Sequence, residues 1–133
     1  MTQRLPTPYF LKTFRSDQTI NHWPIHFAII PSASNHQTEQ ERELQHLRKH
    51  YSWVRCLTLH DADAEHGQNC WAVNMGWQQA CQTGIEFGQE AIFYVSDNTL
   101  SVTFCDERRK PFIVDGFLKR YRVREKNVTR ASM

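Results

Sequence analysis

The sequence predicts an α+β fold: a single domain over residues 1–133, with two helices packed on one mostly antiparallel or mixed sheet of five to six strands. Three observations predict it. A chain of 133 residues suits one hydrophobic core. Short apolar runs of strand length are separated by two longer segments with apolar residues at helical spacing. In chain order these elements read β-α-β-β-α-β-β, for which a ferredoxin-like split arrangement is the closest common topology.

The chain begins with a segment that has no regular pattern. We expect residues 1–24 to form an irregular N-terminal extension, because Pro6, Pro8 and Pro24 interrupt regular structure. Inside this extension, residues 9–14 carry enough apolar side chains to pack. They fit a short helix or an edge strand, and the pattern does not separate the two.

The first strand and the first helix follow this extension. Residues 26–30 are a mostly apolar, partly β-branched run, which is typical of a buried strand. After a polar loop, Thr38 and Glu41 match a capping box, in which both side chains satisfy backbone N–H groups at a helix start. Apolar residues then recur at helical spacing and predict one buried stripe, made of Leu44, Leu47 and Tyr51.

Two more strands and a second helix occupy the middle of the chain. Residues 53–59 and 70–75 are the second and third predicted strands, and the polar residues 60–69 connect them. Gly76 begins a helix, and Gly88 is placed to end it in a left-handed conformation. Small residues on its apolar face would let the helix approach the sheet closely. That face consists of Trp77, Ala80, Cys81, Gly84 and Ile85.

A hairpin completes the predicted order. Residues 91–95 are nearly continuous in apolar side chains, whereas residues 100–105 alternate apolar and polar, as a half-exposed antiparallel strand does. Residues 111–114 add a sixth short strand. They belong to a basic C-terminal segment, 107–133, in which the weakly patterned stretch 119–128 reads as a final strand or a tail.

Composition narrows the class of protein. No apolar run approaches the roughly 20 residues that span a bilayer, and the N-terminal residues lack the apolar core of a signal peptide. We therefore expect a cytoplasmic protein without membrane contact. With five glycines and no glycine-rich phosphate motif, a phosphate-cradling glycine loop is largely excluded, and we expect no cofactor. The four cysteines lie among apolar residues and read as small core residues: Cys56, Cys70, Cys81 and Cys105.

Positive charge gathers towards the C-terminus. The net charge of the chain is only +2, but residues 107–133 hold nine Lys or Arg against three Asp or Glu. Basic side chains interleaved with aromatic rings suit phosphates and bases, and strand alternation would place the last three arginines on one face. In the alternative interpretation these side chains are solvated and deter unwanted sheet pairing. The candidate polyanion-binding residues are Arg108, Arg109, Arg120, Arg122 and Arg124.

The densest group of titratable residues is the predicted loop from His60 to His66. Its imidazoles and carboxylates suit a divalent metal or acid–base chemistry, and the candidate ligands are His60, Asp61, Asp63 and His66. Cys56 and Cys70 flank the loop and suggest a thiolate nucleophile. The alternative is a solvated, turn-rich loop, because the spacing of the two histidines matches no metal-binding motif. We assign no metal or catalytic site to it.

Polar residues also stand at the ends of predicted strands. Asn35 follows the first strand, Gln68 precedes the third, and Gln89 precedes the fourth. Loops at strand ends commonly hold binding sites, so we expect these three side chains to converge above the sheet as a ligand site. In the alternative interpretation Gln89 only ties the helix exit to a loop backbone.

Two motifs carry a family resemblance. Phe27–Ile30 and the block Phe87–Phe93 resemble a small bacterial family that is known only as a domain of unknown function, in which an F-A-I-I strand and an F-G-Q-x-A-I-F block recur. The similarity covers roughly residues 26–105. His36 stands where the family often has Pro, and Gln68–Trp71 replaces an E-x-S-F-like element. The resemblance implies a related fold and supplies no activity.

These observations favour a binding protein over an enzyme. We expect a small non-enzymatic binding or adaptor module for a protein partner or nucleic acid, with a homodimer through exposed Trp53 and Trp71 as one form of partnership. The alternative is a small hydrolase or transferase that uses the His60–His66 loop with a nearby cysteine.

Overall fold

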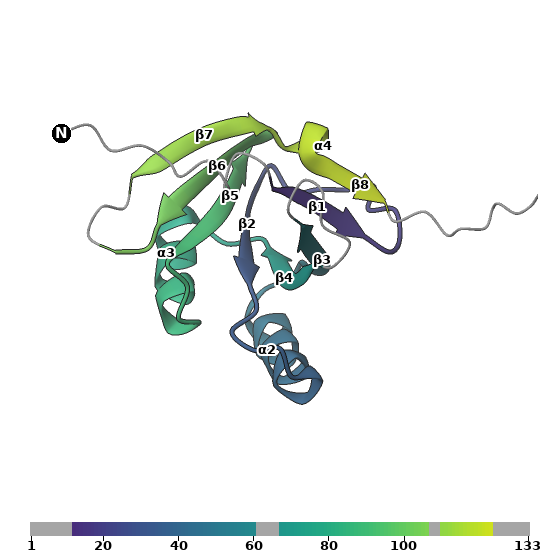
Figure 1. Cartoon of the computed structure of the whole chain (residues 1–133), viewed down its shortest axis with the longest axis vertical. Coiled ribbons are helices and arrows are strands. Elements are labelled where there is room, and N and C mark those ends of the chain that lie inside the picture. The colour runs from purple at the N-terminus through teal and green to yellow at the C-terminus, as the bar shows by residue number, and fades with distance from the viewer. Residues whose placement is uncertain (1–11, 61–66, 107–109, 124–133) are drawn as a thin grey trace, which may run out of the picture.

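A single curled sheet of eight strands forms the protein (Figure 1). The computed structural model describes residues 12–60, 67–106 and 110–123. The strand order is β7-β6-β5-β2-β4-β3-β1-β8, and every neighbouring pair is antiparallel except the parallel pair of β1 and β8. The strands are β1 (Thr13–Ser16), β2 (His26–Pro31), β3 (Val54–His60), β4 (Gln68–Val73), β5 (Ala91–Ser96), β6 (Thr99–Phe104), β7 (Pro111–Gly116) and β8 (Tyr121–Val123).

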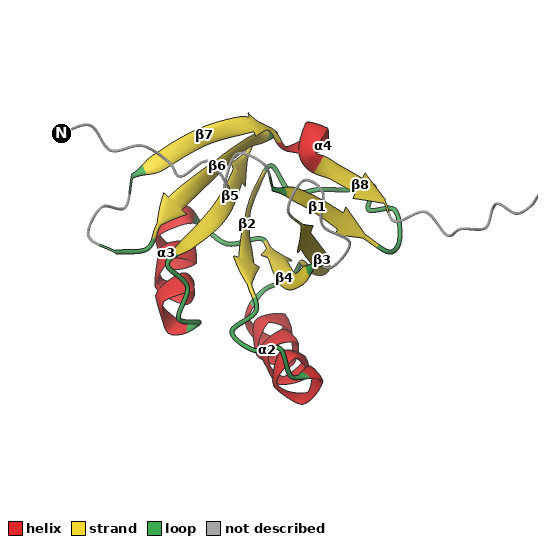
Figure 2. Ribbon diagram, in the orientation of Figure 1, coloured by secondary structure: helices red, strands yellow, loops and turns green. Residues whose placement is uncertain are grey.

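The predicted sheet of five to six strands with two helices is wrong. The described part of the chain has an eight-stranded mixed sheet and three helices, and Figure 2 shows that strands dominate. The helices are α2 (Gln37–His50), α3 (Trp77–Glu86) and α4 (Phe117–Arg120). The additional strands β1 and β8 come from opposite ends of the chain and are four and three residues long. Strands this short show no recognisable periodicity in the sequence, and tertiary packing determines which strands they pair with.

Both chain ends therefore contain more regular structure than the sequence predicts. β1 lies inside residues 1–24, which we expected to be irregular. The predicted strand over 111–114 is confirmed as β7, and α4 and β8 follow it within the basic segment 107–133. Of the stretch 119–128, residues 124–128 lie outside the described part.

Two interleaved split connections lie at the centre of the sheet. Helix α2 joins β2 to β3, and β4 lies between these two strands. Helix α3 joins β4 to β5, and β2 lies between them. β6 and β7 extend the sheet beyond β5, while β1 and β8 extend it beyond β3. In Figure 1 both long helices lie below the sheet and α4 lies above it.

The sheet has an apolar core on each face. Phe27 and Ile29 of β2 belong to the cluster on the concave face, whereas Ala28 and Ile30 belong to the cluster under α2 and α3. All four side chains are at most 1% exposed. Side chains alternate between the two faces along a strand, and both faces of β2 are covered. The sequence of β2 is therefore a continuous apolar run.

Aromatic rings close the concave face. Trp23, from the connection between β1 and β2, stacks on Phe27 with ring centroids 5.3 Å apart. The Trp23 ring also makes T-shaped contacts with Phe117 and Tyr121, with ring centroids 4.9 Å and 5.0 Å apart. Phe117 is 2% exposed and begins α4. Both chain ends thus supply rings to one cluster, which explains why the sheet curls until they meet.

Gly84 lets helix α3 pack closely against the sheet. A Cβ placed there would stand 2.6 Å from Cys105 Sγ and 2.6 Å from Ile92 Cγ2. The helix ends as predicted at Gly88, whose φ is +69°. Its N–H donates to the Ile85 carbonyl over 2.9 Å and the next N–H, of Gln89, donates to Gly84 over 2.8 Å, which is a Schellman motif.

The start of α2 differs from the prediction. The helix begins at Gln37 with His36 as its N-cap, and no side chain caps it. Thr38 therefore lies inside the first turn, and Glu41 accepts a hydrogen bond from Gln37 Nε2 over 3.3 Å. The predicted capping box at Thr38 and Glu41 is wrong because the N-cap is His36, two residues before Thr38.

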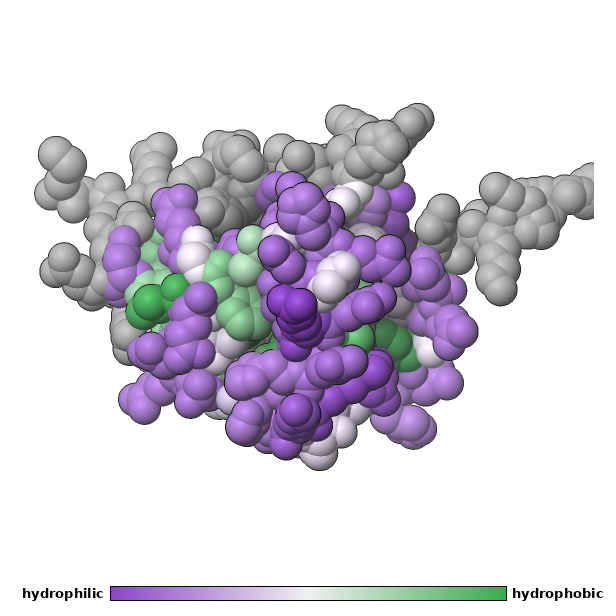
Figure 3. Space-filling model, turned by 90° about the horizontal axis from the view of Figure 1, so that it is seen from below, coloured by the Kyte–Doolittle hydropathy of each residue, from purple (hydrophilic) through white to green (hydrophobic). Residues whose placement is uncertain are grey.

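The outer surface of the helical side is mainly hydrophilic. Figure 3 views this side from below and shows polar residues over most of it, with small hydrophobic patches between them. In the described part of the chain, no helix is long and apolar enough to cross a membrane.

We expect Gly84→Ala to lower the free energy of unfolding by about 1–3 kcal/mol, because the added methyl group overlaps packed side chains. Urea unfolding followed by circular dichroism measures this. Gly76→Ser is the control, since no atom lies within 4 Å of a Cβ at that N-cap and serine is a good capping residue. Equal stability of both variants would contradict the close packing of α3.

Candidate functional site

A polar cleft of about 440 Å³ lies at the end of β2. The loop that follows Pro31 leads into α2, and the start of β4 forms the opposite wall. The lining side chains are mostly neutral amides: Asn35, Gln37, Gln40, Gln68 and Asn69, with Gly67 between them. Carboxamides offer both donors and acceptors, so this cleft suits uncharged hydrogen-bonding groups.

The carbonyl of Ser32 brings two predicted site residues together. Gln68 Nε2 donates to it over 3.4 Å and Gln89 Nε2 donates to it over 3.3 Å. Asn35, the third predicted residue, lines the cleft with Gln68. Gln89 does not line the cleft, and its hydrogen bond to the Ser32 carbonyl holds the loop backbone in place. The three residues therefore meet at one loop, in different roles.

Glu43 of α2 fastens the same loop. Its Oε1 accepts from the Ser32 hydroxyl and from Trp71 Nε1, each over 2.8 Å. Its Oε2 accepts from the Ala33 N–H over 3.0 Å. Hydrogen bonds to a carboxylate are stronger than neutral ones. One side chain thus joins the loop, the helix and β4.

Gln40 and Asn69 complete the support. Asn69 Nδ2 donates to Gln40 Oε1 over 2.8 Å, and Gln40 Nε2 donates to the Ser34 carbonyl over 2.8 Å. Asn35 is the exception, because its exposed amide makes no hydrogen bond with the described part of the chain. A fixed loop that presents one unpartnered amide has the form of a prepared ligand contact.

We expect Glu43→Gln to lower the free energy of unfolding by about 1–3 kcal/mol, because the amide nitrogen cannot accept from the donors that the carboxylate serves. Guanidinium unfolding followed by tryptophan fluorescence measures the change. The matched control is Glu90→Gln, at an exposed side chain with no hydrogen bond in the described chain, which should change stability by less than about 0.5 kcal/mol. A stability unchanged in Glu43→Gln would show that the carboxylate does not fasten the loop.

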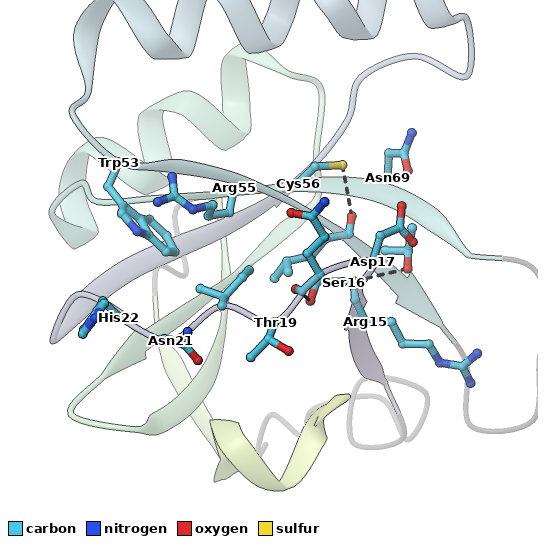
Figure 4. A pocket seen from close by; sticks show the side chains of 14 residues that line it. Arg15, Ser16, Asp17, Thr19, Asn21, His22, Trp53, Arg55, Cys56 and Asn69 are labelled. Carbon is cyan, nitrogen blue, oxygen red and sulfur yellow. Dashed lines mark hydrogen bonds between the residues drawn. The ribbon is translucent and has the colours of Figure 1, made fainter. Parts of the chain in front are cut away.

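A second hollow, a groove of about 590 Å³, lies between β3 and the connection from β1 to β2. Figure 4 shows Trp53, Arg55 and Cys56 of one wall facing the Ser16–His22 connection. Asn69 lines both the groove and the cleft, so the two hollows are neighbours.

The histidine-rich loop does not give a metal site in the described structure. His60 is 6% exposed, and its Nε2 lies 3.0 Å from Thr58 Oγ1. Gly67 packs against this imidazole so closely that a Cβ there would stand 2.5 Å from Nε2. Asp61, Asp63 and His66 lie outside the described residues. Among the residues that are described, no three His, Cys, Asp or Glu side chains form a group that could hold a metal.

The cysteines beside this loop are not activated thiols. Burial raises the pKa of the Cys56 thiol, and the Asp17 carboxylate raises it further. Complete burial raises the pKa of Cys70 well above its ordinary value. Thiolate is the nucleophilic form, so at neutral pH both cysteines stay protonated. This opposes the hydrolase or transferase alternative in its cysteine-dependent form.

Alkylation provides the test. Cys56 is the exposed cysteine, while Cys70, Cys81 and Cys105 are buried. We expect its reaction with iodoacetamide to rise with pH through a midpoint above that of a free cysteine, because only the thiolate reacts. Asp17→Asn should shift this midpoint down, since one cause of the raised pKa is removed. Mass spectrometry of the Cys56 peptide follows the rate, and a midpoint below that of free cysteine would restore the nucleophile hypothesis.

The predicted basic face is not assembled as expected. Arg120 ends α4, so it does not share a strand with Arg122 of β8. Arg120 Nε donates to Asp115 Oδ2 over 3.1 Å, and Arg122 donates to the Lys119 and Tyr121 carbonyls over 3.1 Å and 2.8 Å. The remaining three candidates, Arg108, Arg109 and Arg124, lie outside the described residues.

The two tryptophans that we expected to be exposed are packed. Trp71 is 3% exposed and belongs to the helix-side core. Trp53 is partly buried, with its ring centroid 5.6 Å from Trp23 and 5.7 Å from Phe27. Trp71 is therefore not the exposed dimer contact that we expected, and Trp53 is only partly exposed.

Comparisons with protein families, with curated proteins and with solved structures found no match. The resemblance to a family of unknown function stays a prediction. The site is therefore interpreted from its own geometry.

Several residues of the two hollows were not predicted. Gln40 and Glu43 sit in an ordinary helix sequence, and their inward direction depends on where α2 begins. Arg15 and Arg55 stand far apart in the chain and line one groove because β1 pairs with β3. The one feature of the sequence that points to the groove is the charged residue Arg55 within the otherwise mostly apolar strand 53–59.

Proposed function

We propose that this chain is a non-enzymatic binding module for a protein partner, and that the amide-lined cleft at the end of β2 contacts the partner. One observation carries the proposal: the loop is fixed by Glu43, Gln40 and Gln89, while the Asn35 amide is exposed and unpartnered within the described chain. A rigid support beneath a free polar group favours recognition, because little entropy is lost on binding.

A polypeptide suits this cleft better than a nucleic acid. Its lining is neutral, and carboxamides pair readily with peptide N–H and C=O groups. Of the candidate polyanion-binding arginines that the structure describes, Arg120 is paired with Asp115 and Arg122 donates to backbone carbonyls. Nucleic-acid binding would need phosphate contacts from such side chains.

We expect peptides selected from a random library against the full chain to bind Asn35→Ala about tenfold more weakly, since a hydrogen bond that the bound peptide shields from water is worth up to about 1.5 kcal/mol. Isothermal titration calorimetry measures the affinity. The thermal midpoint of the variant should be unchanged, because the Asn35 side chain makes no internal hydrogen bond with the described residues.

Gln82→Ala is the matched control, an exposed amide on α3 that lines neither hollow. It should leave the affinity unchanged. If Asn35→Ala and Gln82→Ala bind selected peptides equally, the cleft is not the contact surface. If only a single-stranded oligonucleotide binds, the nucleic-acid alternative replaces the proposal.

A further inference from the structure

Half of β3 has an open edge. β1 pairs with β3 from Arg15 opposite Thr58 to Thr13 opposite His60, and the chain bends away after Ser16. Among the described residues, Val54–Leu57 therefore have β4 on one side and no strand on the other. The groove of about 590 Å³ follows this open edge, with the β1–β2 connection as its far wall (Figure 4).

The hydrogen-bond alternation shows which backbone groups face the groove. The Asn74 N–H donates to the Trp53 carbonyl over 3.2 Å, so every second residue of β3, counted from Trp53, bonds to β4. The bond from the Ser32 N–H to the Asn69 carbonyl, 2.9 Å long, fixes the same alternation from the other edge of β4. Val54 and Cys56 consequently direct their N–H and C=O groups to the open edge of β3, where Cys56 lines the groove.

These groups are largely unpaired. The Cys56 N–H donates to no acceptor among the described residues, because the β1 ladder stops at Thr58. The Val54 carbonyl accepts from Arg55 Nη1 over 3.0 Å. Unpaired ladder groups along an open edge are a template for another strand. The Arg55 side chain covers part of this template in the free protein.

The groove wall also has the form that an added strand needs. Trp53, Arg55 and Leu57 lie on one face of β3, and Cys56 and Thr58 lie on the other, yet all five line the groove. A strand beside β3 would therefore find contacts for both sets of its alternating side chains. The open edge from Val54 to Leu57 accommodates about four residues of extended chain, at about 3.3 Å each.

Charge indicates the chemistry of the segment. The Arg15 guanidinium makes no ion pair or hydrogen bond with the described residues. Arg55 stands 4.9 Å from the centroid of the Trp53 ring. Among the described residues of the groove wall, Asp17 is the acidic one, so the two arginines outnumber it. An acidic ligand complements this surface.

We propose that the groove binds an extended, acidic segment of a partner protein as an added strand on β3, a mode that rests on the proposed protein-binding function. Main-chain bonds to Val54 and Cys56 hold the segment, as in other cases of strand addition. Its carboxylates pair with Arg15 and Arg55, and Arg55 leaves the Val54 carbonyl when the partner's N–H takes its place. In the free protein Arg55 discourages unspecific pairing at this edge.

The test uses the full chain and an acetylated, amidated peptide in which glutamate alternates with valine and threonine. We expect hydrogen exchange, followed by NMR, to slow at least tenfold at the Val54 and Cys56 amides when the peptide saturates the protein. The Arg55 and Leu57 amides, already bonded to β4, should not change. The same peptide with lysine in place of glutamate should bind at least tenfold more weakly.

Two variants distinguish the contribution of the Cys56 backbone N–H to binding from that of the Cys56 side chain. Cys56→Pro removes the outward N–H, which an edge strand tolerates, and should weaken binding at least tenfold relative to Cys56→Ala. If Cys56→Pro does not fold, the exchange pattern of the unmodified protein decides. The inference is overturned if the glutamate peptide does not bind, or if it binds without protecting Val54 and Cys56. Loss of library-peptide binding in Asn35→Ala with no protection at Cys56 would keep the binding function and remove strand addition.

Discussion

Both faces of β2 are buried, and this requirement shapes the rest of the protein. Phe27 and Ile29 need an apolar layer on one side, and Ala28 and Ile30 need one on the other. The helices α2 and α3 provide the second layer. The sheet provides the first by curling, until Trp23 and Phe117 from distant parts of the chain close over it.

The cleft is a consequence of where β2 lies. Its end is flanked by β4 and by the exit of α3, because both split connections pass around it. The side chains of Glu43 in α2, Gln68 in β4 and Gln89 after α3 therefore all reach the loop after β2. These hydrogen bonds fix the loop without a further helix or strand. Asn35 stays exposed on the fixed loop.

The groove follows from the same curling. The chain leaves β1 after Ser16 so that Trp23 can reach the concave cluster, where its ring stacks on Phe27. A longer β1 would cover the edge of β3 and keep Trp23 away from that cluster. Filling the concave core with Trp23 thus leaves the edge of β3 open beside Arg55 and Cys56. The arginines that line this edge discourage unspecific strand pairing.

By itself, the sequence determined the elements whose pattern is local: the apolar stripe of α2, the Gly88 helix end, the buried run of β2 and the strand at 111–114. It also pointed to Asn35, Gln68 and Gln89, because polar residues at strand ends stand out. The tertiary structure alone decided the eight-strand sheet, since β1 and β8 are too short for periodicity and pair across the whole chain. It also decided the groove, because the packing of the chain determines how far β1 pairs along β3. No local pattern in the sequence of β3 shows that half of its edge stays open.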